Sequence, residues 1–430
     1  MDSIQISLYN ALAYTLVLVY WKIKHGFSIG LMVWGMFTLS AWCTYLFIQQ
    51  PLYAFSIHYS NQKAIPYIYL FIMLYLLICP FNKLKPLPKG SIDVSHDLFI
   101  KRYMIFMIIV QCASVLINIP ALIDALSLNQ QNITEYKDFS YEESVNIPAF
   151  RIPILAQLKG WVLSGLKISN YALMFILPLC YNKYKKITYY FCIITIAESF
   201  FNTIIAVSRG QMYMLSIFCI FMYVLLFHYT TPKIRKYVTI GGSFLGFLII
   251  SFVLTISLGR FGADNFVFFL YKYFGEPMNN FNGLLFYEVH GTTNGSAYLF
   301  SFIYDLLGIS GFQQTSEKWG YIEHITGVSG QYFYTFIGGF IIEFGKAITM
   351  IIVLILHFFF KKLLKCQLSF NIGRLLIITL IIYCFINGVF YFPLQGRSAF
   401  LIILSTIILY RFFAKNTSRL SRIRNIQNIE

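Results

Sequence analysis

The chain has 430 residues, of which 58% are hydrophobic, 19% aromatic and only 12% charged, and its mean hydropathy is +0.67. A soluble domain carries about 25% charged residues, so this composition excludes a soluble globular protein. The net charge of +16 would suggest a nucleic-acid partner for a soluble protein, but in a membrane protein it reports orientation.

Apolar runs long enough for membrane helices recur along the whole chain. A transmembrane helix needs about 20 residues, and none of the runs shows the alternation of a membrane β-barrel strand. We therefore predict about eleven transmembrane helices and an all-α polytopic membrane fold. The runs lie at about 3–20, 27–48, 64–81, 103–126, 168–182, 187–207, 211–229, 237–257, 332–360, 375–392 and 398–413. The span at 168–182 is short and is expected to begin within 153–167, and the long run at 332–360 is expected to contain an interfacial turn.

Basic residues define the orientation of these spans. Two thirds of the 33 Lys and Arg residues fall into loops that an alternating topology places on one side, which the positive-inside rule assigns to the cytoplasm. The sequence thus predicts an N-terminus outside and a C-terminus inside, with the first span retained rather than cleaved as a signal peptide. The basic clusters lie at about 22–24, 83–102, 183–186, 233–236, 361–374 and 411–424.

Loop lengths indicate where chemistry takes place. The chain 1–430 reads as a single polytopic domain, and its two long loops, at about 127–167 and 258–331, are both predicted outside. A loop this long usually has a function. Within the larger loop, Phe266–Phe274 and Ala297–Gly308 are expected to form short helices on the membrane surface. No phosphate-binding glycine motif, disulfide framework or structural zinc site is predicted.

Four arginines break the positive-inside rule. Arg209, Arg260 and Arg397 stand beside glycines at the outer ends of predicted spans, and Arg151 lies in the shorter outer loop. Guanidinium groups bind phosphate oxygens in a bidentate manner, and glycine lets a ligand approach the backbone. We predict a clamp for an anionic substrate. The alternative is that each arginine extends to lipid headgroups.

The outer face also offers acid–base groups. Glu343 stands at the apolar end of a span, where a carboxylate is costly unless it is paired or hydrated. His290 and His324 lie in the large loop near Glu288 and Glu323. Any of Glu343, His290 or His324 could accept a proton from a hydroxyl; the alternative is an ordinary wet loop. Within the spans, Glu198 is read either as a functional group or as an interhelical contact.

Three short segments carry a resemblance to a known family. These are Val207-Ser-Arg-Gly-Gln211 between two middle spans, Tyr271-Lys-Tyr-Phe-Gly-Glu-Pro277 at the opening of the large loop, and Gly330-Gln-Tyr-Phe-Tyr-Thr335 followed by Glu343-Phe-Gly345. Together with the topology, they resemble the bacterial oligosaccharide repeat-unit polymerases, the Wzy-type O-antigen polymerases. The resemblance implies a fold similar to that of the C-type glycosyltransferases.

The resemblance also implies an activity. Such enzymes lie in the bacterial inner membrane with their active site facing the periplasm. They transfer a glycan from undecaprenyl pyrophosphate to the sugar end of another lipid-linked repeat unit, with no metal or cofactor expected. The expected partners are the lipid-linked oligosaccharide and membrane lipids, and no nucleic acid; a chain-length regulator protein is a further partner left open.

Other classes of membrane protein remain as alternatives. A flippase or transporter of lipid-linked glycans would carry more charged residues along its spans. An O-antigen ligase would perform the same chemistry on a different acceptor. A glycan acyltransferase is less consistent with the sequence, because His228 and His357 lie near predicted cytoplasmic ends.

Overall fold

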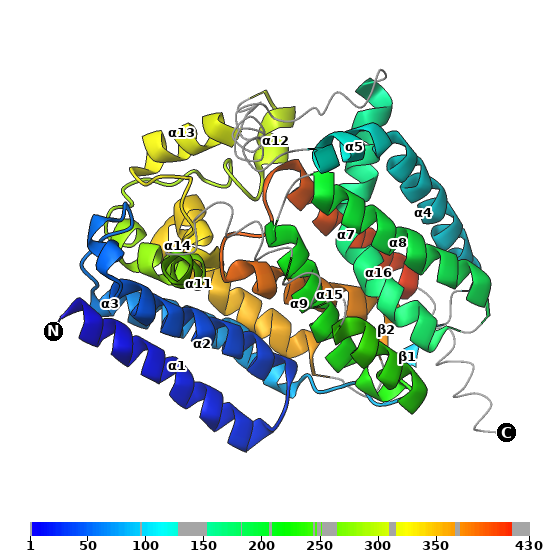
Figure 1. The fold of residues 1–430 in the computed structure, drawn as a ribbon, viewed down its shortest axis with the longest axis horizontal. Helices are drawn as coiled ribbons and strands as arrows, with labels where there is room; N and C mark the ends of the chain where they lie inside the picture. Colours follow the sequence, from blue (N-terminus) through cyan, green and yellow to red (C-terminus); the bar gives the residue numbers. More distant parts are fainter. Residues whose placement is uncertain are drawn as a thin grey trace.

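The fold is that of a computed structural model, and it is built almost entirely of helices (Figure 1). The structure describes residues 2–94, 97–127, 153–181, 183–205, 209–243, 246, 251, 265–308, 315–365 and 370–414. The first half of the chain forms α1 (Ser3–His25), α2 (Ile29–Ile48), η1 (Pro51–Phe55), α3 (Ala64–Ile78), η2 (Cys79–Lys83), β1 (Ile92–Asp93), α4 (Asp97–Ile117), α5 (Ile119–Ser127), α7 (Pro153–Cys180) and α8 (Lys185–Ile205). The second half forms α9 (Arg209–Leu225), η3 (Phe227–Tyr229), α11 (Phe266–Asn280), η4 (Phe281–Leu285), α12 (Ser301–Leu306), α13 (Thr315–Thr326), α14 (Thr335–Leu363), β2 (Phe370–Asn371), α15 (Ile372–Gly388) and α16 (Gly396–Ala414).

Seven helices in the described part of the chain are long and apolar enough to cross a membrane. They are Ser3–His25, Ile29–Ile48, Ala64–Lys83, Asp97–Ile117, Gly160–Cys180, Lys185–Ile205 and Thr335–Leu363. Three shorter apolar helices, Tyr213–Leu225, Ile372–Gly388 and Ser398–Phe413, match further predicted spans. The chain is therefore a helical protein suited to a membrane. The predicted span 237–257 lies mostly outside the described residues.

Several details of the predicted helices are confirmed and one is changed. The helix α7 starts at Pro153, before the apolar run itself. In α14 the backbone leaves helical geometry at Gly345, within the long run 332–360 for which a turn was expected. The predicted run at 103–126 instead divides into α4 and α5, because Pro120 at the second position of α5 lacks the N–H that a continuous helix needs.

Loops predicted on one side of the membrane meet at one end of the bundle. The strand β1 pairs in parallel with β2, which joins two of the basic loops. Ser28 Oγ donates to Asn82 Oδ1 at 3.1 Å, and Lys183 forms an ion pair with Asp97. An alternating topology requires this grouping. The assignment of that end to the cytoplasm stays a prediction from charge.

The helix α11 belongs to the bundle even though it lies in the predicted outer loop. It packs across α2, and Gly275 brings the two backbones so close that an added Cβ would lie 2.6 Å from Thr44 N. Across this contact Ser40 Oγ donates to Phe274 O at 2.8 Å and Thr44 Oγ1 donates to Gly275 O at 2.9 Å. The large loop is thus fixed to the membrane helices through its first element.

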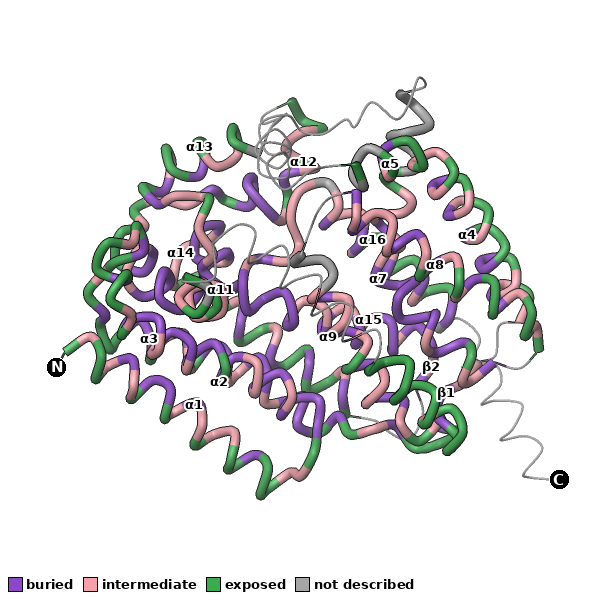
Figure 2. The backbone as a smooth tube through the Cα atoms, viewed as in Figure 1, coloured by how far each residue is buried: buried purple, intermediate pink, exposed green. Residues whose placement is uncertain are grey.

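Burial follows position in the bundle (Figure 2). The helix α15 and the first half of α14 are largely buried among other helices, whereas α1 and α4 expose many apolar residues along the sides of the molecule. Exposed apolar side chains on long helices suit a lipid environment. In Figure 1 α14 is labelled in the left half of the molecule, below α13 of the upper layer that α5, α12 and α13 form.

Candidate functional site

The start of α14 combines backbone strain with an unsatisfied polar group. Thr335 has a φ of 64°, a conformation that is unfavourable for a β-branched residue. Its side chain is buried, and its hydroxyl has no hydrogen-bond partner in the described part of the chain. The backbone is held there because Thr335 N donates to Phe390 O at 3.1 Å. Strain of this kind concentrates at functional sites, so Thr335 marks the centre of the candidate site.

Glu343 lies on α14 about two turns beyond Thr335 and is fully buried. Its carboxylate accepts hydrogen bonds from Thr293 Oγ1 at 3.1 Å and from the backbone N–H of Tyr298. The helix breaks at Gly345, whose φ of 76° favours glycine. One carboxylate therefore anchors the segment 293–298 to the interrupted helix.

Lys318 of α13 completes this cluster. Its ammonium donates to Gln395 Oε1 at 2.9 Å and lies 4.3 Å from the centroid of the Tyr298 ring. Burial lowers the pKa of Lys318 to about 8, and the charge of Glu343 opposes that shift. Gly396 N donates to Tyr298 O at 3.1 Å, which ties the start of α16 to the same cluster.

A second buried carboxylate lies on α11. Glu276 Oε1 is 3.6 Å from His58 Nε2 and accepts from Asn280 Nδ2 at 3.2 Å. Burial raises the pKa of Glu276 to about 7, against the opposing effects of Lys272, Asn280 and Phe333 N–H. Burial likewise lowers the pKa of His58 to about 4, and repulsion by Lys272 lowers it further. At neutral pH the two side chains therefore do not form a full ion pair.

This buried pair predicts opposite pH dependences for two variants. In the unfolded chain His58 titrates near 6.5 and Glu276 near 4.5. Between those values the unfolded chain holds an extra proton on His58 and the folded chain holds one on Glu276, so their effects on stability cancel. In Glu276→Gln only His58 still titrates in this window, and the unfolded chain binds one proton more than the folded chain. The free energy of unfolding should therefore rise with pH by up to about 1.4 kcal/mol per pH unit. His58→Gln should show the reverse slope.

The measurement is thermal unfolding of the purified protein in detergent across that pH window. The wild-type protein, with both groups present, serves as the control and should show a melting temperature that changes little. Slopes of the same sign in the two variants would contradict the assigned protonation states.

The structure places the two histidines predicted from sequence, His290 and His324, close to the C-terminal end of α13. Both are exposed. His290 N donates to Thr326 O at 3.0 Å, and His324 lies in the last turn of α13, which ends at Thr326. His290 also stands three residues before Thr293, the residue that donates to Glu343. His290 and the two residues that donate to Glu343, Thr293 and Tyr298, therefore belong to one short segment of the chain.

The predicted arginine clamp is described only through its backbone. Arg209 begins α9 and Arg397 is the second residue of α16, but their side chains lie outside the described structure. Arg151 and Arg260 fall outside the described residues altogether. Arg209 and Arg397 thus occupy helix N-termini, where backbone N–H groups and the helix dipole favour an anion.

Ring contacts bring the start of α9 toward the same centre. Tyr213, one turn after Arg209, lies with its ring centroid 5.7 Å from that of Phe274 and 6.2 Å from that of Phe390. Phe274 precedes Glu276 on α11, and Phe390 O holds Thr335. Segments that stand far apart in sequence therefore surround the start of α14.

Sequence reasoning missed His58 and Lys318. It noted Glu276 among the carboxylates of the large loop and Thr335 in a segment that carries the resemblance, but it did not predict that either belongs to this site. His58 stands in a short loop that carries no recognisable motif, and Lys318 resembles any surface lysine of the large loop. Glu276 had one usable signal, because Gly275–Asn280 is unusually polar beside an apolar helix. The strain at Thr335 is a property of its backbone angle alone, so no sequence signal could have revealed it.

Within the described ranges, no group of three or more His, Cys, Asp and Glu side chains is arranged to hold a metal ion. Comparison of the chain with protein-family models, with curated proteins and with solved structures gave no match. The functional argument therefore depends on the chain's own residues.

Proposed function

We propose that this protein is a glycosyltransferase that polymerises oligosaccharide repeat units carried on undecaprenyl pyrophosphate, at the periplasmic face of a bacterial inner membrane. The observation that carries the proposal is the cluster around Glu343. A buried carboxylate, the Lys318 ammonium and the start of α16 with Arg397 meet at the ends of the membrane helices that are predicted to face outside. A lipid-linked donor presents its pyrophosphate at that depth.

The proposed reaction exchanges one bond to an anomeric carbon for another. The bond between that carbon and the pyrophosphate oxygen breaks, and the electron pair leaves with undecaprenyl pyrophosphate. A hydroxyl oxygen of the acceptor glycan forms the new bond to the carbon, and its proton passes to a base on the protein. The enzyme must stabilise the charge that develops on the pyrophosphate and must supply the base.

Charge stabilisation is assigned to the arginines. Arg209 and Arg397 occupy the N-termini of α9 and α16, so a phosphate there would meet both guanidinium groups and free backbone N–H groups. Arg260 and Arg151 are proposed to extend the clamp from the two outer loops. Guanidinium suits this role because it stays charged and binds phosphate oxygens in pairs.

The base is assigned to His290. Glu343 is fully buried, and its carboxylate already accepts hydrogen bonds from Thr293 and Tyr298. That pattern suits a positioning residue that fixes the segment 293–298. His290 is exposed at the start of the same segment, where an acceptor hydroxyl can reach its imidazole. His324, which is exposed on α13, is the next candidate.

The test is polymerisation by the purified protein in liposomes that contain undecaprenyl-pyrophosphate-linked repeat units. The wild-type protein should produce a ladder of longer glycans. His290→Asn should slow chain growth by about 10²–10⁴-fold, the usual contribution of a general base. His324→Asn is the matched control and should retain most of the rate. Absence of any ladder from the wild-type protein would reject the proposed function, and equal rates for both variants would reject the role of His290.

A second candidate is a flippase for the same lipid-linked glycans. It is favoured by one observation, because Lys167 and Glu198 are ionisable residues inside predicted spans, which is typical of transporters. Transfer of a labelled lipid-linked glycan across vesicles without chain growth would support it. An O-antigen ligase would instead give a single transfer to a lipid A core acceptor and no ladder.

A further inference from the structure

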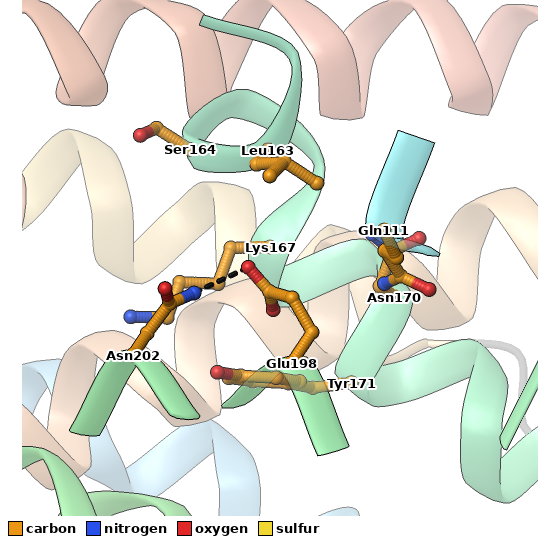
Figure 3. A pocket seen from close by; sticks show the side chains of 8 residues that line it. All are labelled: Gln111, Leu163, Ser164, Lys167, Asn170, Tyr171, Glu198 and Asn202. Atoms are coloured by element: carbon orange, nitrogen blue, oxygen red, sulfur yellow. Dashed lines mark hydrogen bonds between the residues drawn. The ribbon is translucent and has the colours of Figure 1, made fainter. Parts of the chain in front are cut away.

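A polar cavity of about 210 Å³ lies among three of the membrane-spanning helices, separate from the Glu343 cluster (Figure 3). Its polar lining consists of Gln111 from α4, Ser164, Lys167 and Asn170 from α7, and Glu198 and Asn202 from α8. At about 30 Å³ per water molecule the cavity has room for about seven waters. Polar side chains at this density inside spans are costly in a lipid environment unless they serve a function.

The cavity lies toward the ends of the helices that are predicted to face outside. Gln111 is six residues before the end of α4 at Ile117, and Asn202 is three residues before the end of α8 at Ile205. At 1.5 Å per residue these side chains start about 9 Å and 5 Å below the helix ends. A group carried near the outer membrane surface could therefore reach them.

Two amides of the lining are oriented by hydrogen bonds on their oxygen atoms. Thr195 Oγ1 donates to Gln111 Oε1 at 3.1 Å, and Tyr103 OH donates to Asn170 Oδ1 at 2.6 Å. Each amide nitrogen is therefore left as a donor, and neither has a hydrogen-bond partner in the described part of the structure. Figure 3 shows these two side chains together at one side of the cavity.

The opposite side of the cavity carries Lys167 and Glu198, which do not form an ion pair with each other. Glu198 accepts a hydrogen bond from Asn202, whose own oxygen accepts from Asn118 at 3.3 Å. Lys167 lies beside them, and its ammonium has no hydrogen bond or ion pair with any described residue; it stands 6.0 Å from the centroid of the Tyr171 ring. In Figure 3 Glu198, Lys167 and Asn202 form a group away from Gln111 and Asn170.

This lining specifies the chemistry of a ligand. Three N–H donors without partners call for a ligand that is rich in oxygen, and the Glu198 carboxylate calls for one that also donates. A pyrophosphate would bring further negative charge against the Glu198 carboxylate, which is unfavourable in a low-dielectric site. A sugar ring meets all of these conditions, because its hydroxyls both donate and accept.

We propose that the cavity between α4, α7 and α8 binds one sugar ring. Lys167, Gln111 and Asn170 donate to its oxygens, and Glu198 accepts from one of its hydroxyls. The volume admits a single ring rather than an oligosaccharide. The inference rests on the proposed function only for the source of that sugar, which is the glycan of a lipid-linked repeat unit. The cavity would then select the identity of one sugar in the unit.

The experiment measures binding of free sugars to the full-length protein in detergent by saturation-transfer NMR. The probes are glucose, galactose, N-acetylglucosamine and rhamnose, with inorganic pyrophosphate as a competitor. At least one sugar should show saturable binding, and pyrophosphate should not displace it. Lys167→Met should weaken binding about tenfold or more, the effect of losing one charged hydrogen bond. Lys186→Met, an exposed lysine on α8, is the matched control and should bind as the wild type does.

A milder variant separates loss of the site from loss of the fold. Gln111→Leu keeps the size of the side chain and removes one donor. The Thr195 hydroxyl loses its acceptor but can turn to a backbone carbonyl one turn back along α8, so binding should weaken while the melting temperature stays close to that of the wild type. The proposal is overturned if none of the sugars binds at up to about 100 mM, if pyrophosphate competes, or if Lys167→Met binds normally. Because the assay needs no lipid carrier and no turnover, a failure of polymerisation leaves its outcome unaffected.

Discussion

Glu343→Ala is expected to abolish polymerisation and to lower the melting temperature. The substitution removes the acceptor for the backbone N–H of Tyr298 and for the Thr293 hydroxyl. Each buried donor left without a partner costs about 1–3 kcal/mol. The segment 293–298 then loses its attachment to α14, and His290 loses its position. Thermal unfolding and the liposome polymerisation assay measure the two effects.

Glu343→Gln is the variant that separates a positioning role from a catalytic one. Its amide oxygen can still accept from Tyr298 N, and the Thr293 hydroxyl can rotate to accept from its amide nitrogen. We therefore expect stability and polymerisation close to those of the wild-type protein. If Glu343→Gln folds normally and still loses about 10²–10⁴-fold in rate, the magnitude of a general base, then Glu343 is itself the base.

Gly275→Ala is expected to be the most damaging methyl-sized substitution on α11. The added Cβ would lie 2.6 Å from Thr44 N and 2.7 Å from Cys43 O, both backbone atoms of α2. A backbone cannot move aside as a flexible side chain can, so the overpacking should cost about 1–3 kcal/mol. The displaced α11 would also separate Glu276 from His58. Thermal unfolding in detergent measures the loss.

Gly35→Ala is the matched control for this prediction. Gly35 lies on α2 as well, but an added Cβ there would meet only Leu18 Cδ1, at an ordinary distance of 3.8 Å. Alanine has the higher helix propensity, so this variant should be neutral or slightly more stable. An unchanged melting temperature for Gly275→Ala would mean that α11 is not held against α2 as described.

The membrane helices were predictable because the lipid environment acts on each residue locally. A span must be long and apolar whatever its neighbours are, so α1, α2 and α3 follow directly from composition. A start of α7 within 153–167 and a turn within the run 332–360 were also predicted, because the one apolar run is too short and the other too long for a simple span. The division at Pro120 was missed because the apolar composition continues through it.

The candidate site was predictable only in part, because its residues are joined by contacts over long sequence distances. Glu343 was recognised since a carboxylate at the end of an apolar span is conspicuous in the sequence itself. Its partners Thr293 and Tyr298 were not, and neither was the contact of Glu276 with His58, two residues that lie about half of the chain apart in sequence. The large outer loop also gave no indication that α11 packs into the bundle.

By itself, the sequence determined that the chain is a helical protein suited to a membrane, and it predicts where the spans lie and which loops share a side. Those properties depend on the hydrophobicity and charge of each segment taken alone. Only the tertiary structure decided which polar residues are buried together. It placed Lys318 beside the Glu343 cluster, paired His58 with Glu276 and enclosed Lys167 and Glu198 in one cavity. The reason is physical: the cost of burying a charge is set by the neighbours that folding brings to it.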